Sequence, residues 1–195
     1  MRNPIAALCL FALILPSGLN AQTQSGPTPY PDAKNSAQWP GKGPIRWFGW
    51  MTENRNAFWK QRQADQGKIV FAGDSIIGGW KLEKDFPGKP LANRGIGGDV
   101  TRGLLFRLQE DILDLKPKAI VLEIGSNDIT ADASIADVVS NYDTILETIA
   151  KASPGTPVVV MAMTPHGIPE GAKAPSEALK TYLLKVNARL PEANK

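Results

Sequence analysis

The stretch that decides the fold is Lys68-Ile69-Val70-Phe71-Ala72-Gly73-Asp74-Ser75. It is a short apolar run that stops at a glycine, which is typical of a strand buried on both faces of a parallel sheet. Similar runs follow at 119–124 and 158–163, and a weaker one covers 90–93. Helical periodicity separates these runs, so the sequence predicts parallel strands whose carboxyl ends meet at one edge of a sheet.

The helical segments lie between and after these strands. Residues 100–115 and 135–149 repeat apolar side chains at spacings of three and four, and a further helix is predicted to include 179–186. The expected N-caps are Asp99, Ser134 and Ser176. This alternation predicts an α/β fold, specifically a flavodoxin-like three-layer α/β/α arrangement around a central parallel sheet.

Residues 1–21 have the pattern of a secretory signal peptide. Arg2 supplies the positive charge, residues 5–15 are all apolar, and Ala21 precedes the expected cleavage point. Eleven residues at about 1.5 Å each cannot cross ~30 Å of hydrocarbon. We therefore expect an exported protein, periplasmic or secreted, without a stable membrane span once the signal is removed.

Two further segments complete the expected organisation. Residues 22–45 contain five prolines and are predicted to be an exposed leader. Residues 46–195 are predicted to be the functional domain. Aromatic residues crowd its first positions, and the favoured interpretation is a helix capped by Thr52 that covers a sheet face with Phe58 and Trp59.

Composition excludes several classes of protein. The 22 Lys+Arg and 19 Asp+Glu residues leave a net charge of +3, too weak for a nucleic-acid-binding face. One cysteine and one histidine exclude a disulfide framework and a Cys/His zinc cluster. We therefore expect neither a nucleic-acid partner nor a metal site.

Polar residues follow the predicted strands. They are Ser75, the pair Gly97-Gly98, Asn127 and His166. A hydroxyl, backbone N–H groups that glycine leaves accessible, and a neutral amide together suit a nucleophile with an oxyanion hole. Each residue type is more often a cap, a turn or a loop residue. Their joint position at one sheet edge is what favours acyl transfer.

Three sequence blocks in register resemble the SGNH (GDSL-type) esterases and lipases. The blocks are Gly73-Asp74-Ser75-Ile76, Asn93-Arg94-Gly95-Ile96-Gly97-Gly98-Asp99 and Gly125-Ser126-Asn127-Asp128. The resemblance covers about 68–190, and the stretch 95–105 is most similar to the branch of the platelet-activating-factor acetylhydrolase catalytic subunits.

This resemblance implies a role for each matched residue. Ser75 would be the nucleophile and would supply one oxyanion N–H, Gly98 the second N–H, and Asn127 a side-chain donor. The family's substrates are carboxylic esters of lipids, carbohydrates or small molecules, and no metal or organic cofactor is implied. Asp74 and His166 are expected to bind substrate.

The family's Asp-x-x-His motif, which supplies the base, is missing from the sequence. We therefore expect the chain to be cut before its last strand and to lack its catalytic Asp and His. The rival hypothesis makes His166 the base, but no aspartate near it in the sequence would orient it.

Two other motifs fit the same residues poorly, and one alternative function stays open. Val100 replaces the last glycine of a dinucleotide-binding fingerprint, and Ile77 breaks the Gly-x-Ser-x-Gly pattern of α/β-hydrolases. The alternative from a different class is a non-catalytic exported glycan-binding module on a degenerate esterase scaffold.

Overall fold

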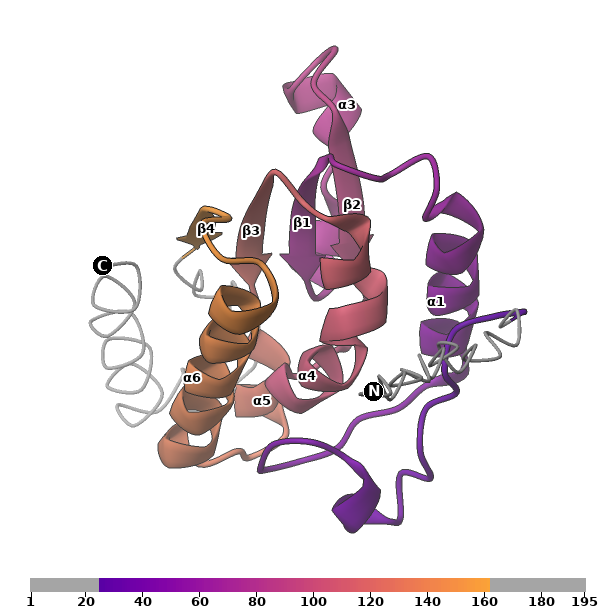
Figure 1. Ribbon diagram of the computed structural model, residues 1–195. Coiled ribbons are helices and arrows are strands. Elements are labelled where there is room, and N and C mark those ends of the chain that lie inside the picture. Colours follow the sequence, from indigo (N-terminus) through magenta and orange to yellow (C-terminus); the bar gives the residue numbers. More distant parts are fainter. Residues whose placement is uncertain (1–24, 162–195) are drawn as a thin grey trace, which may run out of the picture.

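A parallel sheet forms the centre of the computed structural model, which describes residues 25–161 (Figure 1). Its strands are β1 (Ile69–Gly73), β2 (Leu91–Gly95), β3 (Ala119–Glu123) and β4 (Val158–Val160), in the order β2-β1-β3-β4. β1 pairs in parallel with β2 and β3, and β3 pairs with β4. The predicted α/β class and parallel sheet are confirmed.

One helix precedes the first strand in the chain, and the others lie between the strands. The helices are α1 (Gly49–Gln61), α2 (Ser75–Gly79), α3 (Leu82–Asp85), α4 (Thr101–Asp111), α5 (Ser126–Thr130) and α6 (Ile135–Ala152), with 3₁₀ turns at Ser36–Gln38 and Leu113–Leu115. The helix predicted to include 179–186 and its cap Ser176 lie outside the described residues. No helix within 25–161 is both long enough and apolar enough to span a membrane.

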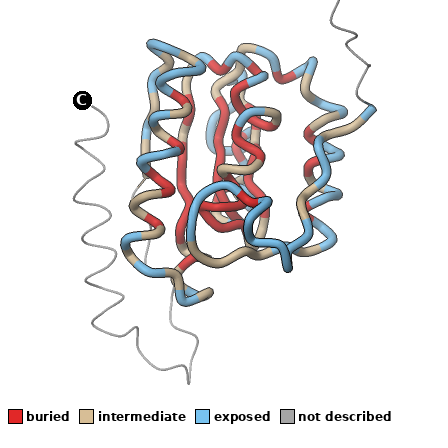
Figure 2. The backbone as a smooth tube through the Cα atoms, turned by 60° about the horizontal axis from the view of Figure 1, so that its bottom comes forward, coloured by how far each residue is buried: buried red, intermediate tan, exposed pale blue. Residues whose placement is uncertain are grey.

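The main core lies between one face of the sheet and helices α4 and α6 (Figure 1). Figure 2 shows the buried residues concentrated along the strands and on the inner sides of these helices. Most residues that carried the helical periodicity are buried: Val100, Leu104, Leu108, Ile112, Leu115, Val138, Tyr142, Ile145 and Ile149. Ile135, at the start of α6, is only half-buried. A smaller cluster around Phe71, Ile77 and Leu82 packs against the opposite face.

The predicted helix caps had different outcomes. Ser134 caps α6 as expected, because its side chain accepts a hydrogen bond from the Asp137 N–H. Thr52 is not a cap: α1 begins three residues earlier, at Gly49, after extended Phe48. Asp99 is not the cap of α4 either, since Val100 occupies that position.

Residues 25–45, the described part of the expected exposed leader, are mostly exposed or half-buried, but they pack against the helices α4 and α6. Trp39 is only 4% exposed. Tyr30 stacks on Trp39 with ring centroids 5.5 Å apart, and both rings contact Phe106 of α4. Prolines prevent regular structure here, but they do not prevent packing.

Arg102 of α4 holds this segment in place. Its guanidinium donates to the carbonyl oxygens of Ser36, Trp39, Pro40 and Gly43, and to the Ser36 hydroxyl. These carbonyls belong to backbone outside any sheet, so the charged Arg102 side chain supplies donors that a strand ladder would provide elsewhere; the Ser36 carbonyl also accepts from the Trp39 N–H.

Replacing Arg102 by methionine is expected to release residues 36–43 from α4. Because several charge-assisted hydrogen bonds are lost together, the free energy of unfolding should fall by about 2–3 kcal/mol. Limited proteolysis and hydrogen exchange should then show cleavage and exchange in 36–43. The control is Arg62→Met, because the Arg62 guanidinium donates to the Trp59 carbonyl and lies over the Trp59 ring, within its own helical turn. Equal protection of 36–43 in both variants would contradict the prediction.

Candidate active site

The sheet brings three predicted site residues to one edge. Gly73, Gly95 and Glu123 are register partners, so β1, β2 and β3 end side by side. Ser75, the Gly97-Gly98 pair and Asn127 each follow one of these strand ends. A β-carbon built on Gly97 would lie 3.8 Å from the Ser75 Cβ, so these two loops are in contact.

Ser75 is the first residue of α2 and is exposed to solvent. Asp74 precedes it and is completely buried. The Asp74 Oδ1 accepts a hydrogen bond of 2.9 Å from the Ile76 N–H, which fixes the first turn of α2. The local sequence therefore presents a hydroxyl at the sheet edge on a backbone that is held from behind.

Gly98 has a left-handed backbone, with φ of +84°, that favours glycine. A β-carbon at this position would also lie 3.1 Å from the Phe48 ring. The adjacent Gly97 carbonyl accepts a hydrogen bond of 2.9 Å from the Trp50 indole N–H. The left-handed backbone and the nearby Phe48 ring therefore both require glycine at position 98, whose N–H is the proposed second oxyanion donor.

The Asn127 amide joins the Ser75 loop to the Gly98 loop. Its Nδ2 donates to Asp74 Oδ2 at 3.2 Å and to the Asp99 carbonyl at 3.0 Å. Its Oδ1 accepts from the Arg46 guanidinium at 3.1 Å. The structure thus orients the NH₂ group toward the two loops that carry Ser75 and Gly98.

Arg107 is a positioning residue that the sequence did not reveal. Its completely buried guanidinium forms an ion pair with Asp99 at 2.8 Å and donates to the carbonyls of Gly73 and Arg94. Burial opposes the charge, but the Asp99 carboxylate raises the pKa of Arg107 and keeps it protonated. One side chain therefore ties together the ends of β1 and β2 and the loop after β2.

Asp128 performs the capping role that was predicted for Asp99. Its two carboxylate oxygens accept hydrogen bonds from the backbone N–H and the hydroxyl of Thr101, at 2.9 and 2.6 Å. Burial raises the pKa of Asp128 to about 6, against the lowering effect of the Thr101 hydrogen bonds. Asp128, in α5, therefore caps the start of α4, while the Asp99 side chain forms an ion pair with Arg107.

An aromatic and cationic wall, formed by residues 46–50, flanks the oxyanion loops. Phe48 stacks on Trp50 with ring centroids 4.4 Å apart, and the Arg46 guanidinium lies 5.4 Å from the Phe48 centroid. Trp47 and Trp50 are each about half exposed. The aromatic crowding was visible in the sequence, but its position beside Gly98 and Asn127 was not.

The two residues predicted to bind substrate are Asp74 and His166. Asp74 is buried, and its side chain accepts hydrogen bonds from protein groups, so we assign it a positioning role behind Ser75 rather than contact with substrate. His166 lies outside the described residues. Within 25–161 no cluster of three His, Cys, Asp or Glu side chains is arranged to hold a metal ion.

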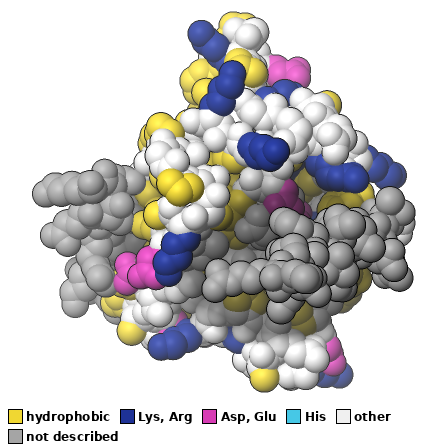
Figure 3. Space-filling model, in the orientation of Figure 1, with side chains coloured by type: hydrophobic (Ala, Val, Ile, Leu, Met, Phe, Trp, Pro, Cys, Tyr) yellow, Lys and Arg dark blue, Asp and Glu magenta, His cyan; other side chains and the backbone are white. Residues whose placement is uncertain are grey.

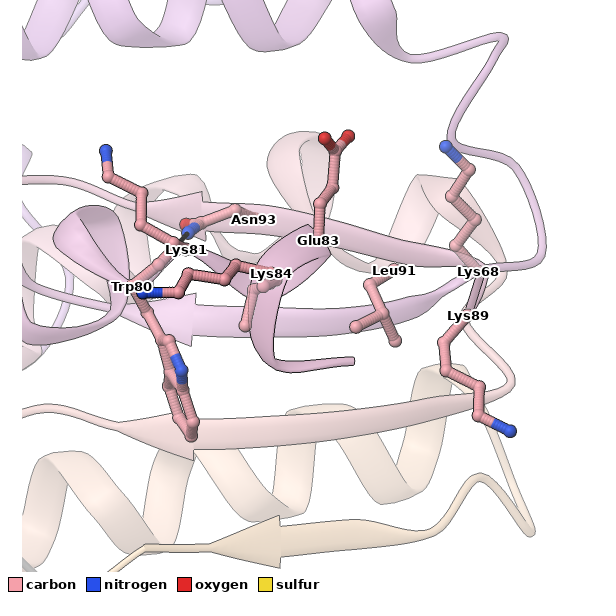
Figure 4. A pocket seen from close by; sticks show the side chains of 9 residues that line it. Lys68, Trp80, Lys81, Glu83, Lys84, Lys89, Leu91 and Asn93 are labelled. Carbon is pink, nitrogen blue, oxygen red and sulfur yellow. Dashed lines mark hydrogen bonds between the residues drawn. The ribbon is translucent and has the colours of Figure 1, made fainter. Parts of the chain in front are cut away.

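A hollow of about 580 Å³ lies elsewhere, beside β2 and α3 (Figure 4). Four lysines line it, but Figure 4 shows Lys81 and Lys68 at opposite ends, with ammonium groups that do not converge. On the face shown in Figure 3, basic side chains are likewise spread over several elements with neutral residues between them. These features do not compete with the sheet edge as the candidate site.

Comparison with known proteins is consistent with this geometry. Residues 71–195 match the GDSL-like Lipase/Acylhydrolase family. The alpha2 subunit of platelet-activating factor acetylhydrolase IB from Homo sapiens is 28% identical over 172 residues, covering 86% of this chain and 71% of the relative. The alpha1 subunit from Rattus norvegicus is 27% identical over 158 residues, covering 77% and 61%.

A solved structure supports the fold. A GDSL-like lipase from Bacteroides thetaiotaomicron superimposes with a TM-score of 0.56 at 24% identity, covering 73% of this chain and 70% of that one. At this identity the similarity concerns the arrangement of strands and helices.

Proposed function

Because this chain belongs to the GDSL-like lipase/acylhydrolase family, we propose that it is a serine esterase that hydrolyses carboxylic esters of acetyl or short acyl groups. The observation that carries the proposal is the convergence of exposed Ser75 with Gly98 and the Asn127 amide. Buried side chains hold all three loops, as an oxyanion hole organised before substrate arrives requires.

The proposed reaction begins when Ser75 Oγ attacks the ester carbonyl carbon and its proton passes to a general base. The resulting oxyanion accepts hydrogen bonds from the Ser75 and Gly98 N–H groups and from Asn127 Nδ2. The two Asn127 Nδ2 hydrogens are donated to Asp74 Oδ2 and to the Asp99 carbonyl before the reaction, so one of these bonds is exchanged for the oxyanion. The C–O bond then breaks, the alcohol leaves with a proton, and water hydrolyses the acyl-enzyme. Family resemblance assigns the base to a histidine, and the sequence's single histidine, His166, lies outside the described residues.

Two observations support the choice of substrate class. The mammalian relatives are named platelet-activating factor acetylhydrolase, and the word acetylhydrolase favours a small acyl group. The half-exposed Trp50 indole lies beside the oxyanion loops, where it donates to the Gly97 carbonyl, and the Trp47 indole is also half exposed. Such indoles suit the alcohol portion of a carbohydrate or lipid ester. The signal-peptide pattern of residues 1–21 supports action outside the cytoplasm.

The same exposed indoles favour a second candidate, a glycan-binding module without turnover. Because the base is expected from the missing Asp-x-x-His motif, hydrolysis of 4-nitrophenyl acetate is measured both on the purified 195-residue chain and on a chain extended through that motif. These two measurements distinguish the two functions, and the kinetic predictions for variants refer to whichever chain turns the ester over. Turnover above the buffer rate that a serine-directed fluorophosphonate abolishes supports the esterase. Binding of an acetylated oligosaccharide without deacetylation would support the module.

Asn127→Ala is expected to lower kcat for 4-nitrophenyl acetate by about 10²- to 10³-fold and to change KM by less than about threefold. The amide strengthens its hydrogen bond as the carbonyl oxygen becomes an oxyanion, so its loss affects the transition state more than the bound ester. Steady-state kinetics provide the measurement. Asn56→Ala, an exposed site on α1, is the control, and equal kcat values for the two variants would contradict the assignment.

A further inference from the structure

Glu123 is a buried acid that the proposed reaction does not use. It is the last residue of β3, opposite Gly73 in the register, and is only 1% exposed. Neither of its carboxylate oxygens has a hydrogen-bond partner among the described residues. A buried carboxylate without donors is costly, so its presence at the end of a central strand needs a physical reason.

The neighbours of Glu123 indicate which form it takes. Asp74 directly follows Gly73, the register partner of Glu123, and Ser126 starts α5 three residues after Glu123. The Asp74 carboxyl and the Ser126 hydroxyl both act on the pKa of Glu123. Asp74 accepts hydrogen bonds from the Ile76 N–H and from Asn127 Nδ2. Those donors stabilise Asp74 as the ionised partner, and two adjacent carboxylates do not both ionise readily.

We propose that Glu123 is a positioning residue that carries a proton, donates its O–H to Asp74, and thereby holds the first turn of α2 and the Asn127 amide in place. Asp74 then accepts hydrogen bonds from three groups: the Ile76 N–H behind Ser75, the Asn127 side-chain amide at the oxyanion position, and the Glu123 O–H at the end of β3. This arrangement gives the buried, protonated Glu123 an acceptor, the Asp74 carboxylate.

Loss of the Glu123 proton should loosen this arrangement. Burial, followed by the Asp74 charge, raises the pKa of Glu123 to about 7, with the Ser126 hydroxyl acting in the opposite direction. Above that pH a second negative charge would repel Asp74 and would also oppose an oxyanion at Asn127. The expected effect on the rate of ester hydrolysis rests on the proposed esterase function. The expected repulsion between Glu123 and Asp74 does not depend on that function.

The direct test follows two amide groups by ¹H–¹⁵N NMR between pH 5.5 and 8.5. In the wild-type chain the Ile76 backbone amide and the Asn127 side-chain amide should shift together with a midpoint near 7. Glu123→Gln keeps the shape and a donor but cannot ionise, so both signals should stay flat. Glu147→Gln, at an exposed carboxyl on α6, should titrate as the wild type does.

Two results would overturn the proposal. One is the absence of any shift at Ile76 and Asn127 in the wild type. The other is the same titration in Glu123→Gln, which would assign the titration to another group.

Thermal unfolding supplies a second, independent measurement. Because the native pKa lies above the ordinary value of 4.5, stability from this group is full below about 4.5 and is lost as pH rises through about 7.

The melting temperature of Glu123→Gln minus that of the wild type should therefore be about 5 °C larger at pH 8.5 than at pH 5.5. A difference that does not depend on pH would also overturn the proposal.

Activity separates this inference from the proposed function. Wild-type kcat/KM should fall about tenfold from pH 7 to 9, after subtraction of spontaneous hydrolysis, and Glu123→Gln should lose this decline. Amide titration without esterase activity at any pH would support the role of Glu123 and reject the esterase.

Discussion

Replacing Ser75 by alanine is expected to lower kcat for ester hydrolysis by at least about 10⁴-fold and to leave the fold intact. The hydroxyl is the group that forms the acyl-enzyme, so no other described side chain at the sheet edge replaces it. Ser75 is exposed and its side chain contributes little to the core, so stability should change little.

Kinetics with 4-nitrophenyl acetate and mass spectrometry after fluorophosphonate treatment measure this effect. The label should be found on the peptide that contains Ser75 and should be absent from Ser75→Ala. Ser153→Ala, at the end of α6, should keep both activity and labelling. Activity retained in Ser75→Ala, or a label on another residue, would reject the nucleophile.

Arg107→Met is expected to lower the free energy of unfolding by about 3–5 kcal/mol, because it leaves the Asp99 carboxylate buried without its partner. The carbonyls of Gly73 and Arg94 lose donors at the same time. Denaturant unfolding followed by circular dichroism measures the loss. Activity should fall with it, because Gly73 and Asp99 adjoin the loops that carry Ser75 and Gly98.

The matched control is Lys151→Met, which removes the cation of an exposed ion pair with Glu147 on α6. Solvent screens that pair, so the change should leave the unfolding midpoint where it is. Equal losses for the two substitutions would show that burial of the Arg107–Asp99 pair has no special effect.

Much of the fold was predictable because its signals are local. The apolar run of β1 and its glycine stop need no information from distant residues. The same is true of the periodicity that buries Leu104 and Leu108, and of the Ser134 cap, whose partner is three residues away. Ser75, Gly98 and Asn127 could be predicted as candidates because each follows a strand, and parallel strands end at one edge.

The errors share a physical cause, which is competition from residues far away in the chain. Asp99 suits a helix cap, but the buried Arg107 guanidinium takes its side chain, and Asp128 caps α4 in its place. The proline-rich segment is mostly exposed, as its composition suggests, but its attachment to α4 by Arg102 and the aromatic ring of Phe106 was not predicted. No local pattern indicates which of two possible partners a polar side chain will choose.

The sequence by itself determined the α/β class, the parallel sheet and the identity of the candidate nucleophile, because these depend on periodicity and on short motifs. Only the tertiary structure decided what holds that site: Arg107 across two strand ends, Arg46 on Asn127, and Glu123 against Asp74. Charges removed from water need partners, and the partners become known only when the chain has brought distant residues together.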